Sequence, residues 1–310
     1  MQHFNSNGKI LLTGEYAVLD GAKALALPTR MGQSLQVSEI DEKDQIEWKS
    51  FDPENKIWFN AKFRTENGHF NPVLSEEDQK DPEAKTIADQ LQKILQSAFR
   101  ANPGKFENSY SLSTRLEFDR KWGLGSSSTL INNISNWLEI DPYSLLKESF
   151  GGSGYDIAAA QSNNPVTFQI TKNGPVSFAA DFNPDFKDRL FFVYLNRKQN
   201  SREAIAHYRN QNPEHLQKLI EKISGLTESI ISCDSLQEFE MLVQAHETLI
   251  SKAIELPKVK QQLFPDYPGC IKSLGGWGGD FILATGSSEN QEYFRNKGYD
   301  TIFDYSDLIL

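Results

Sequence analysis

Residues 121–129 read Lys121-Trp122-Gly123-Leu124-Gly125-Ser126-Ser127-Ser128-Thr129 and are the most informative segment of the chain. The two glycines allow positive φ angles and a close approach of the backbone to a ligand. The serines open a predicted helix, where free N–H groups favour a phosphate and a hydroxyl suits Mg²⁺. A serine N-cap after a glycine turn explains the same residues.

A second glycine turn, Gly152-Ser153-Gly154-Tyr155-Asp156, places a carboxylate at the start of another predicted helix. An aspartate there is suited to act as a general base or as the partner of a cation. The alternative is a helix carboxylate that is stabilised only by the helix dipole.

Two further segments carry glycines. Residues 272–280 read Lys272-Ser273-Leu274-Gly275-Gly276-Trp277-Gly278-Gly279-Asp280, which favours a tight loop near a ligand or a plain β-hairpin turn. Near the N-terminus, Gly8-Lys9 opens a predicted strand that ends at Gly14. Lys9 would neutralise a transferring phosphoryl group or keep Asp156 ionised, unless it is an ordinary solvated lysine.

Familiar catalytic motifs are missing from the sequence. It holds no Walker A loop, no G-x-G-x-x-G and no protein-kinase H-R-D or D-F-G signature. His246-Glu247 begins like a zinc-binding H-E-x-x-H, but residue 250 is Ile. With five histidines and two cysteines scattered along the chain, a zinc site is not expected.

Composition narrows the class of protein further. The 310 residues carry a formal net charge of −10, which argues against a basic face for nucleic acid. Cys233 and Cys270 form no disulfide framework, and no signal peptide is recognised, so we expect a cytoplasmic protein. The apolar run from Leu190 to Leu195 is far too short to span a membrane.

Hydrophobic periodicity predicts a mixed chain. Helices are expected over residues 82–101, from the 123–128 turn to Asp141, and over 143–150, 155–161, 201–209, 213–233 and 235–253. Strands are expected over 9–13, 110–118, 166–170 and 190–195, on both sides of Gly275–Gly279, and among the loops of 39–80. A last helix and strand are expected to close the chain. No regular βαβ alternation is visible, which predicts an α+β architecture. The segment between the strands at 166–170 and 190–195 carries two prolines and several Asn and Asp residues, so we expect the boundary there, between domains 1–185 and 186–310.

In this order and spacing, the four segments resemble the GHMP kinase superfamily. Its signature positions are an N-terminal G-K-x-x-L-x-G-E, a G-L-G-S-S loop, a G-Y-D turn and a late glycine loop, and the match runs from Gly8 to Asp280. Each segment alone is weak, but four in order are specific. The details are most similar to the mevalonate-pathway branch, and within it to phosphomevalonate kinases of the GYDIA type. One departure is Phe150, which stands where that family tends to place a lysine.

The resemblance implies a two-lobed α+β fold, with an N-terminal lobe like domain 2 of ribosomal protein S5 and a ferredoxin-like C-terminal lobe. It implies a kinase that uses ATP and Mg²⁺ on a small-molecule acceptor in isoprenoid precursor synthesis, as a monomer or homodimer without nucleic-acid or membrane partners. Phosphomevalonate is the expected acceptor. A mevalonate kinase, a GHMP kinase with another acceptor, and a non-catalytic metabolite-binding protein remain alternatives.

The resemblance also assigns roles to residues. Asp156 would accept the acceptor's proton, and Lys9 would hold that carboxylate ionised and neutralise the transition state. Mg²⁺ would be held by Ser127 and Glu148. The phosphate cradle would consist of Gly123, Leu124, Gly125, Ser126, Ser127 and Ser128. The acceptor side would consist of Glu15, Tyr16, Ser153, Gly154, Gly276 and Gly278.

Overall fold

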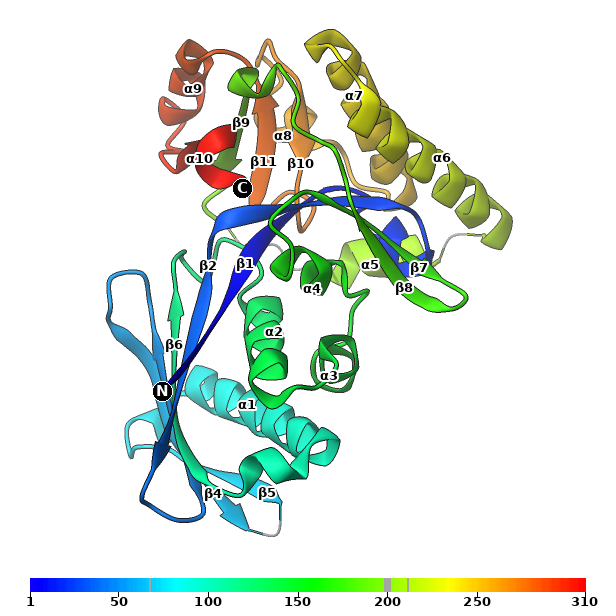
Figure 1. Cartoon of the computed structure of the whole chain (residues 1–310). Coiled ribbons are helices and arrows are strands. Elements are labelled where there is room, and N and C mark those ends of the chain that lie inside the picture. Colours follow the sequence, from blue (N-terminus) through cyan, green and yellow to red (C-terminus); the bar gives the residue numbers. More distant parts are fainter. Residues whose placement is uncertain (67, 198–201, 211) are drawn as a thin grey trace. The chain divides into compact units, whose positions relative to one another are not determined.

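The computed structural model describes residues 1–66, 68–197, 202–210 and 212–310 (Figure 1). The chain forms two compact units that interleave along the sequence. The first unit is Met1–Gly8, Met31–Arg120 and Gly125–Gln161, and the second is Lys9–Arg30, Lys121–Leu124 and Ser162–Leu310. The predicted domains 1–185 and 186–310 are contiguous instead, and that division stays a prediction.

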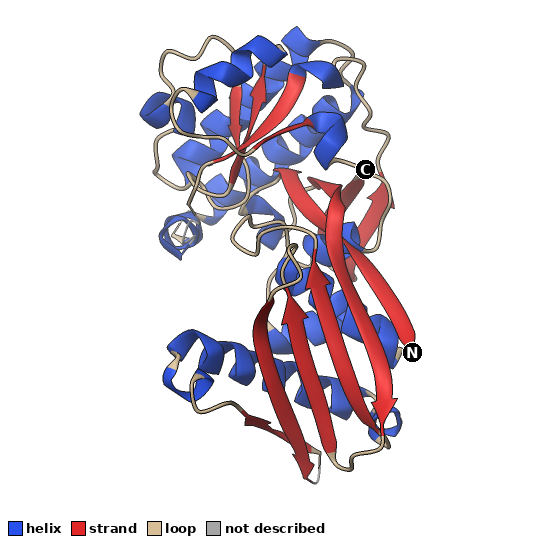
Figure 2. Ribbon diagram, turned by 90° about the vertical axis from the view of Figure 1, so that its left-hand side faces the viewer, coloured by secondary structure: helices blue, strands red, loops and turns tan. Residues whose placement is uncertain are grey.

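The first unit is a twisted sheet covered by helices on one face (Figure 2). Its strands follow the order β5-β4-β3-β6-β2, and all neighbours are antiparallel except β3 and β6. The strands are β2 (Ala24–Ile40), β3 (Gln45–Phe51), β4 (Ile57–Glu66), β5 (His69–Val73) and β6 (Ser109–Leu116). The helices are α1 (Pro82–Ala101), α2 (Ser126–Leu138), α3 (Pro142–Ser149) and α4 (Tyr155–Ala160).

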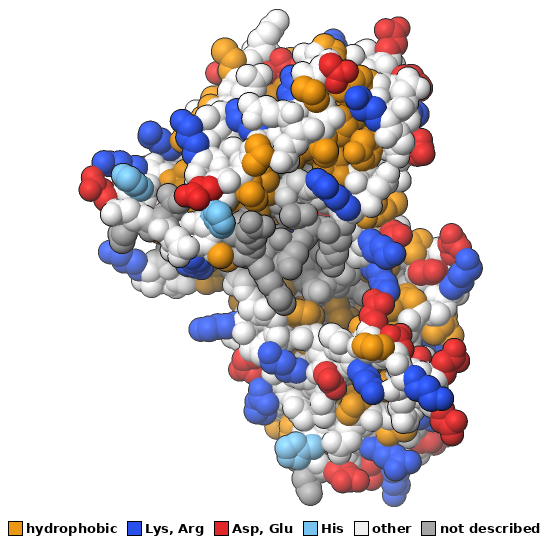
Figure 3. Space-filling model, turned by 180° about the vertical axis from the view of Figure 1, so that it is seen from behind, with side chains coloured by type: hydrophobic (Ala, Val, Ile, Leu, Met, Phe, Trp, Pro, Cys, Tyr) orange, Lys and Arg blue, Asp and Glu red, His pale blue; other side chains and the backbone are white. Residues whose placement is uncertain are grey.

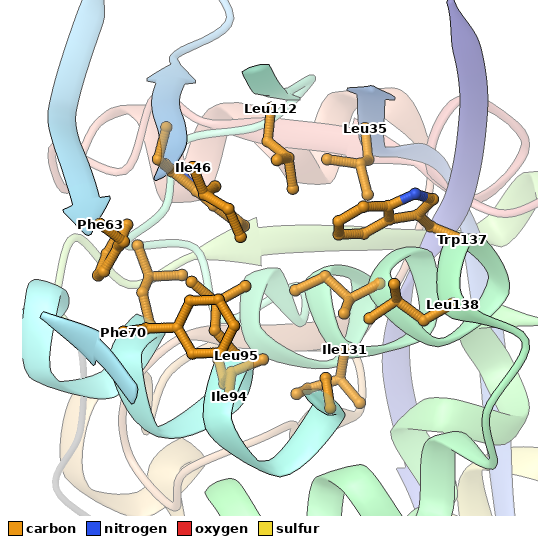
Figure 4. Close-up of a cluster of buried hydrophobic side chains, with 14 of the residues drawn as sticks. Leu35, Ile46, Phe63, Phe70, Ile94, Leu95, Leu112, Ile131, Trp137 and Leu138 are labelled. Carbon is orange, nitrogen blue, oxygen red and sulfur yellow. The ribbon is translucent and has the colours of Figure 1, made fainter. Parts of the chain in front are cut away.

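The core of this unit lies between the sheet and α1 and α2 (Figure 4). Alternate residues of β4 are buried, as the period of two in a half-buried strand requires. On α1, buried Leu91, Ile94 and Leu95 recur at helical spacing, and Asp81 caps the helix by accepting from the Glu83 N–H. Trp137 of α2 completes the same cluster.

The second unit contains a four-stranded antiparallel sheet of order β10-β11-β9-β12. Its strands are β9 (Leu190–Tyr194), β10 (Ile271–Ser273), β11 (Phe281–Thr285) and β12 (Ile302–Asp304). A hairpin of β7 (Val166–Thr171) and β8 (Gly174–Ala179) pairs with Ala24–Ala26 at the start of β2. β1 (Gln2–Thr13) also pairs with β2.

The helices of the second unit differ widely in length. Two long ones, α6 (Pro213–Ser232) and α7 (Leu236–Ala253), pack against each other. The others are α5 (Arg202–Arg209), α8 (Val259–Leu263), α9 (Ser288–Arg295) and α10 (Tyr305–Leu308). Short 3₁₀ segments in the chain are Ala17–Asp20, Asp78–Lys80, Pro103–Phe106 and Lys187–Arg189.

The predicted mixture of strands and helices is confirmed. Each helix that was predicted with bounds lies within about three residues of them in the described ranges, and Ser201 lies outside those ranges. Two strands were not predicted: the 17-residue β2 and the edge strand β8, whose Pro175 and Gly174 read as loop. No helix in the described ranges is both long and apolar enough to cross a membrane. Basic and acidic side chains are interspersed over the face shown in Figure 3.

Candidate functional site

In the second unit, Lys9 holds the beginning of the first glycine loop. Its backbone N–H donates to the Leu124 carbonyl at 2.9 Å, and its Nζ donates to the Gly123 carbonyl at 2.8 Å. Lys9 is partly buried on β1, so its amine lies against the loop rather than extending into water. Lys9 therefore lies beside this loop, whereas its predicted charge-neutralising role stays a prediction. Asp156 belongs to the first unit, so its pairing with Lys9 stays a prediction.

Asp280 joins the early and late glycine loops of the second unit. A Cβ on Gly123 would lie 2.7 Å from the Asp280 Cγ, and a Cβ on Gly275 would lie 2.8 Å from its Oδ2. Glycine is therefore required at both positions for the carboxylate to lie where it does. The Gly276 N–H donates to the same Oδ2 at 3.3 Å. Sequence reasoning gave Asp280 no role, although it ends the late glycine segment.

In the first unit, α2 begins without a side-chain cap. Gly125 is its N-cap residue with φ of 95°, and no side chain accepts from the first N–H groups. Ser128 Oγ instead donates back to the Gly125 carbonyl at 2.9 Å, whereas Ser127 is exposed. The serine N-cap alternative is therefore wrong. The start of α2 therefore has no side-chain cap, and an anion there would interact favourably with the helix dipole. Ser127 is the most exposed serine of the loop, since Ser126 is half-buried and Ser128 is buried.

The second glycine turn leads into α4. Gly154 is the N-cap with φ of 94°, and Asp156 stands in the first turn, half-buried, with its Oδ1 accepting from the Ile157 N–H at 3.1 Å. The helix packs against α2, and Gln161 Nε2 donates to Asn132 Oδ1 at 2.9 Å. Ser127 and Asp156 thus lie in the first turns of two adjacent helices of one unit.

Glu148 is not brought to Ser127. Its carboxylate pairs with Arg100 of α1 at 2.9 Å, and hydrogen bonds from Arg100 and then Ser97 lower its pKa. Glu148 lines a hollow together with Glu139 and Ile140, which follow the C-terminal end of α2. Since α2 has 13 residues, that end lies roughly 18 Å from Ser127 at the helix's N-terminus. The expected two-residue Mg²⁺ site is therefore corrected: these two side chains do not share an ion.

Glu15 is buried in a charged cluster of the second unit. Its Oε1 accepts from Lys272 Nζ, which also donates to Glu247 Oε1 at 3.2 Å and to the Ser273 carbonyl at 3.0 Å. Ser273 Oγ donates to Glu247 Oε2 at 3.2 Å. Lys272 is 0% exposed and Glu15 only 3%. Glu15 therefore ties the end of β1 to β10 from within the protein.

Burial governs the titration of this cluster. It raises the pKa of Glu15 to about 7 against the opposing attraction of Lys272, and it raises the pKa of Glu247 in the same way. Burial disfavours the charged lysine, but Glu15 and Glu247 together raise the pKa of Lys272. Lys272 is thus a fixed cation, and one carboxylate of the pair readily takes up a proton.

A metal ion does not fit this cluster. Ligand atoms of Glu15, His246 and Glu247 lie within 4.8 Å of one another, which is close enough to share an ion. The Lys272 ammonium, however, already occupies the space between the two carboxylates. A second cation there would meet strong repulsion at low dielectric.

Tyr16 and the late glycine loop meet at Trp277. The Trp277 N–H donates to Tyr16 Oη at 3.1 Å, and its indole Nε1 donates to the Pro257 carbonyl at 2.9 Å. Tyr16 and Trp277 belong to one buried cluster with residues of α5, α6 and α7. The carbonyl of Gly278 accepts from Arg197 Nε at 2.6 Å. The predicted acceptor-side residues Tyr16, Gly276 and Gly278 are therefore close to one another in the second unit.

Known proteins resemble this chain in fold but not in sequence. No family model matches the sequence, and no curated protein matches it. Among solved structures, mevalonate kinase from L. major with R-mevalonate has a TM-score of 0.68 at 14% identity, covering 98% of this chain and 94% of its own. Phosphomevalonate kinase from Streptococcus pneumoniae, solved with phosphomevalonate and AMPPNP, has 0.66 at 16%, covering 98% and 99%.

A third similar structure is a kinase with a different substrate. Lactococcus lactis galactokinase with galactose has a TM-score of 0.66 at 12% identity, covering 97% of this chain and 92% of its own. The chain therefore has the fold of the GHMP kinases. Both mevalonate-pathway kinases are among the structures that share this fold over nearly its whole length.

Proposed function

We propose that this protein is an ATP-dependent kinase of the GHMP type that phosphorylates phosphomevalonate in isoprenoid precursor synthesis. The observation that carries the proposal is the open start of α2, where Gly125 takes a left-handed conformation and no side chain caps the helix. A free helix N-terminus after a glycine turn is suited to the phosphates of ATP. We further propose that the chain has one lobe like domain 2 of ribosomal protein S5 and one ferredoxin-like lobe.

Each site residue has a part in the proposed transfer. Residues 123–128 would cradle the phosphates, and Lys9 would neutralise charge on the transferring group. Ser127 would hold Mg²⁺, which supplies charge neutralisation when bound. Asp156 would accept the proton of the acceptor hydroxyl. The acceptor would contact Tyr16, Ser153, Gly154, Gly276 and Gly278, whereas buried Glu15 would act by holding the turn before Tyr16.

Phe150 favours an alternative acceptor substrate. It is the C-cap residue of α3, is 43% exposed and carries no charge, where a lysine would favour a phosphorylated acceptor. Mevalonate, which has one anionic group fewer, is therefore the alternative substrate. A non-catalytic binding protein is the remaining alternative, and the presence of Lys9, Ser127 and Asp156 argues against it.

The test is an acceptor panel read by product mass. Purified protein is incubated with ATP and Mg²⁺ and, separately, with mevalonate, phosphomevalonate, homoserine and galactose, and each reaction is repeated with EDTA. We expect diphosphomevalonate from phosphomevalonate, and no product with EDTA. If the protein instead makes phosphomevalonate from mevalonate, the proposed acceptor is wrong but the proposed phosphoryl transfer stands. ATP binding without any product would contradict the proposed kinase activity.

A further inference from the structure

Tyr16 stands in a strained backbone turn. Its φ of 60° and ψ of −49° are combined with a hydrogen bond from the Ala17 N–H to the Glu15 carbonyl at 2.6 Å. This is a γ-turn of the classic sense, which is rare and strained for a residue with a side chain. Such strain persists only where the surroundings hold it, and it concentrates at functional sites.

Three contacts hold this turn, at Gly14 just before it and at Glu15 and Tyr16 within it. The Gly14 N–H donates to His246 Nε2 at 3.1 Å, the Glu15 carboxylate pairs with Lys272, and Tyr16 Oη accepts from the Trp277 N–H. The partners come from α7, from β10 and from the glycine loop that follows β10. All three contacts lie within the second unit.

Burial of His246 is energetically unfavourable, and packing alone does not explain why a histidine stands there. It is 0% exposed, and burial, followed by repulsion from Lys272, lowers its pKa well below the usual range, so the ring is neutral. Since Nε2 accepts from Gly14, the proton is on Nδ1, which has no hydrogen-bond partner among the described residues. A buried N–H without a partner is destabilising, and an apolar side chain would avoid it.

The neighbouring residue makes the arrangement specific. Glu247 follows His246 on α7 and binds Lys272 and Ser273, which belong to β10, the strand before the late glycine loop. Two successive residues of one helix therefore hold the first motif and the last motif. A hydrogen bond to a main-chain N–H fixes the peptide itself, not only a side chain.

We propose that His246 is a positioning residue: it fixes the Gly14 peptide, and with it the γ-turn at Tyr16, against the loop of residues 275–280. Tyr16 and that loop are thereby set in place before the acceptor binds. The kinetic consequence rests on the proposed kinase function, whereas the structural claim stands without it.

The test uses two polar replacements of different reach. In His246→Gln, the side-chain oxygen reaches the position of Nε2 and can accept from the Gly14 N–H. The glutamine amide nitrogen would then lie near Glu15 Oε2, which is 3.4 Å from His246 Nε2 in the unmodified protein. In His246→Asn the side chain is too short. Val243→Ala, at a position that is also buried on α7 but lies outside the cluster of Tyr16 and Trp277, is the control for general destabilisation. The readouts are hydrogen exchange of a peptide with residues 14–18, and kcat and KM for acceptor and for ATP.

We expect His246→Asn to increase the rate of hydrogen exchange in residues 14–18 by about tenfold. We expect the same variant to lower kcat/KM for the acceptor by about tenfold. Each change corresponds to the free energy of about one hydrogen bond. The KM for ATP should change less than about twofold, because the substitution disturbs the proposed acceptor side and does not loosen the whole protein. His246→Gln should restore most of both losses. The proposal would be overturned if the Asn and Gln variants behaved alike, or if the Asn variant behaved like the Val243→Ala control. If the unmodified protein phosphorylates nothing, the proposed function fails and hydrogen exchange alone decides the positioning claim.

Discussion

At the scale of single residues, Glu15 links folding to pH. The charged and titratable groups that face it are Lys272, Glu247 and His246. Its pKa rises from 4.5 in the unfolded chain to about 7 in the native protein, mainly because of burial. The native state therefore binds this proton more tightly than the unfolded state. The contribution to stability is complete below pH 4.5 and is lost as pH rises towards 7.

Glu15→Gln should remove this dependence. The amide imitates the protonated carboxyl, so we expect little loss of stability at pH 5 and a flatter curve between pH 5 and 7.5. The unmodified protein should lose up to about 1.4 kcal/mol of unfolding free energy per pH unit from this group. Urea unfolding at a series of pH values measures both slopes.

Glu228→Gln is the matched control, because Glu228 pairs with Lys23 at the surface and is 63% exposed. Its slope should equal that of the unmodified protein. A Glu15→Gln slope that matches the control would show that Glu15 is ionised throughout this range.

At the scale of elements, the turn that ends β1 depends on Gly14. Its φ is 91°, and a Cβ there would lie 2.6 Å from the Ala24 Cβ and 2.9 Å from the Ala24 Cα, at the start of β2. The second contact is with backbone, so a side-chain rotation cannot relieve it. The approach of β1's end to β2 thus requires both the open conformation and the missing side chain of glycine.

Gly14→Ala and Gly152→Ala separate these two requirements. Gly152 also has positive φ, at 106°, but nothing lies within 4 Å of its added Cβ. We expect Gly152→Ala to cost about 1 kcal/mol of unfolding free energy, and Gly14→Ala at least about 2 kcal/mol more, because the clash adds to the strain. Chemical denaturation compares the two variants. Equal losses would mean that β2 moves away at little cost.

At the scale of the whole molecule, local patterns predicted elements well and distant contacts poorly. The helical spacing of Leu91, Ile94 and Leu95 was enough to place α1. β2 was missed because Pro28 and Gly32 interrupt its pattern, although Gly32 has the partner strand close beside it. Strand β8 was missed because its burial is low at an edge of the sheet.

The candidate site divides in the same way. The glycine turns at Gly125 and Gly154 were predicted, because their conformation follows from local sequence. His246 was seen only as a failed zinc motif, since its partner Gly14 is 232 positions away. Glu148 was assigned to the Mg²⁺ site with Ser127 by the family resemblance, but α3 places it near the opposite end of α2. Contacts of this kind depend on how the helices pack, which periodicity does not contain.

The most direct test of the proposed phosphoryl transfer is Asp156→Asn, assayed by ³¹P NMR with the best acceptor of the panel beside the unmodified protein. The amide keeps the size of the side chain but cannot accept the acceptor's proton, so kcat should fall by about 10²-fold or more. The Kd for ATP should stay nearly unchanged. Turnover close to that of the unmodified protein would contradict the assignment of Asp156 and the mechanism built on it.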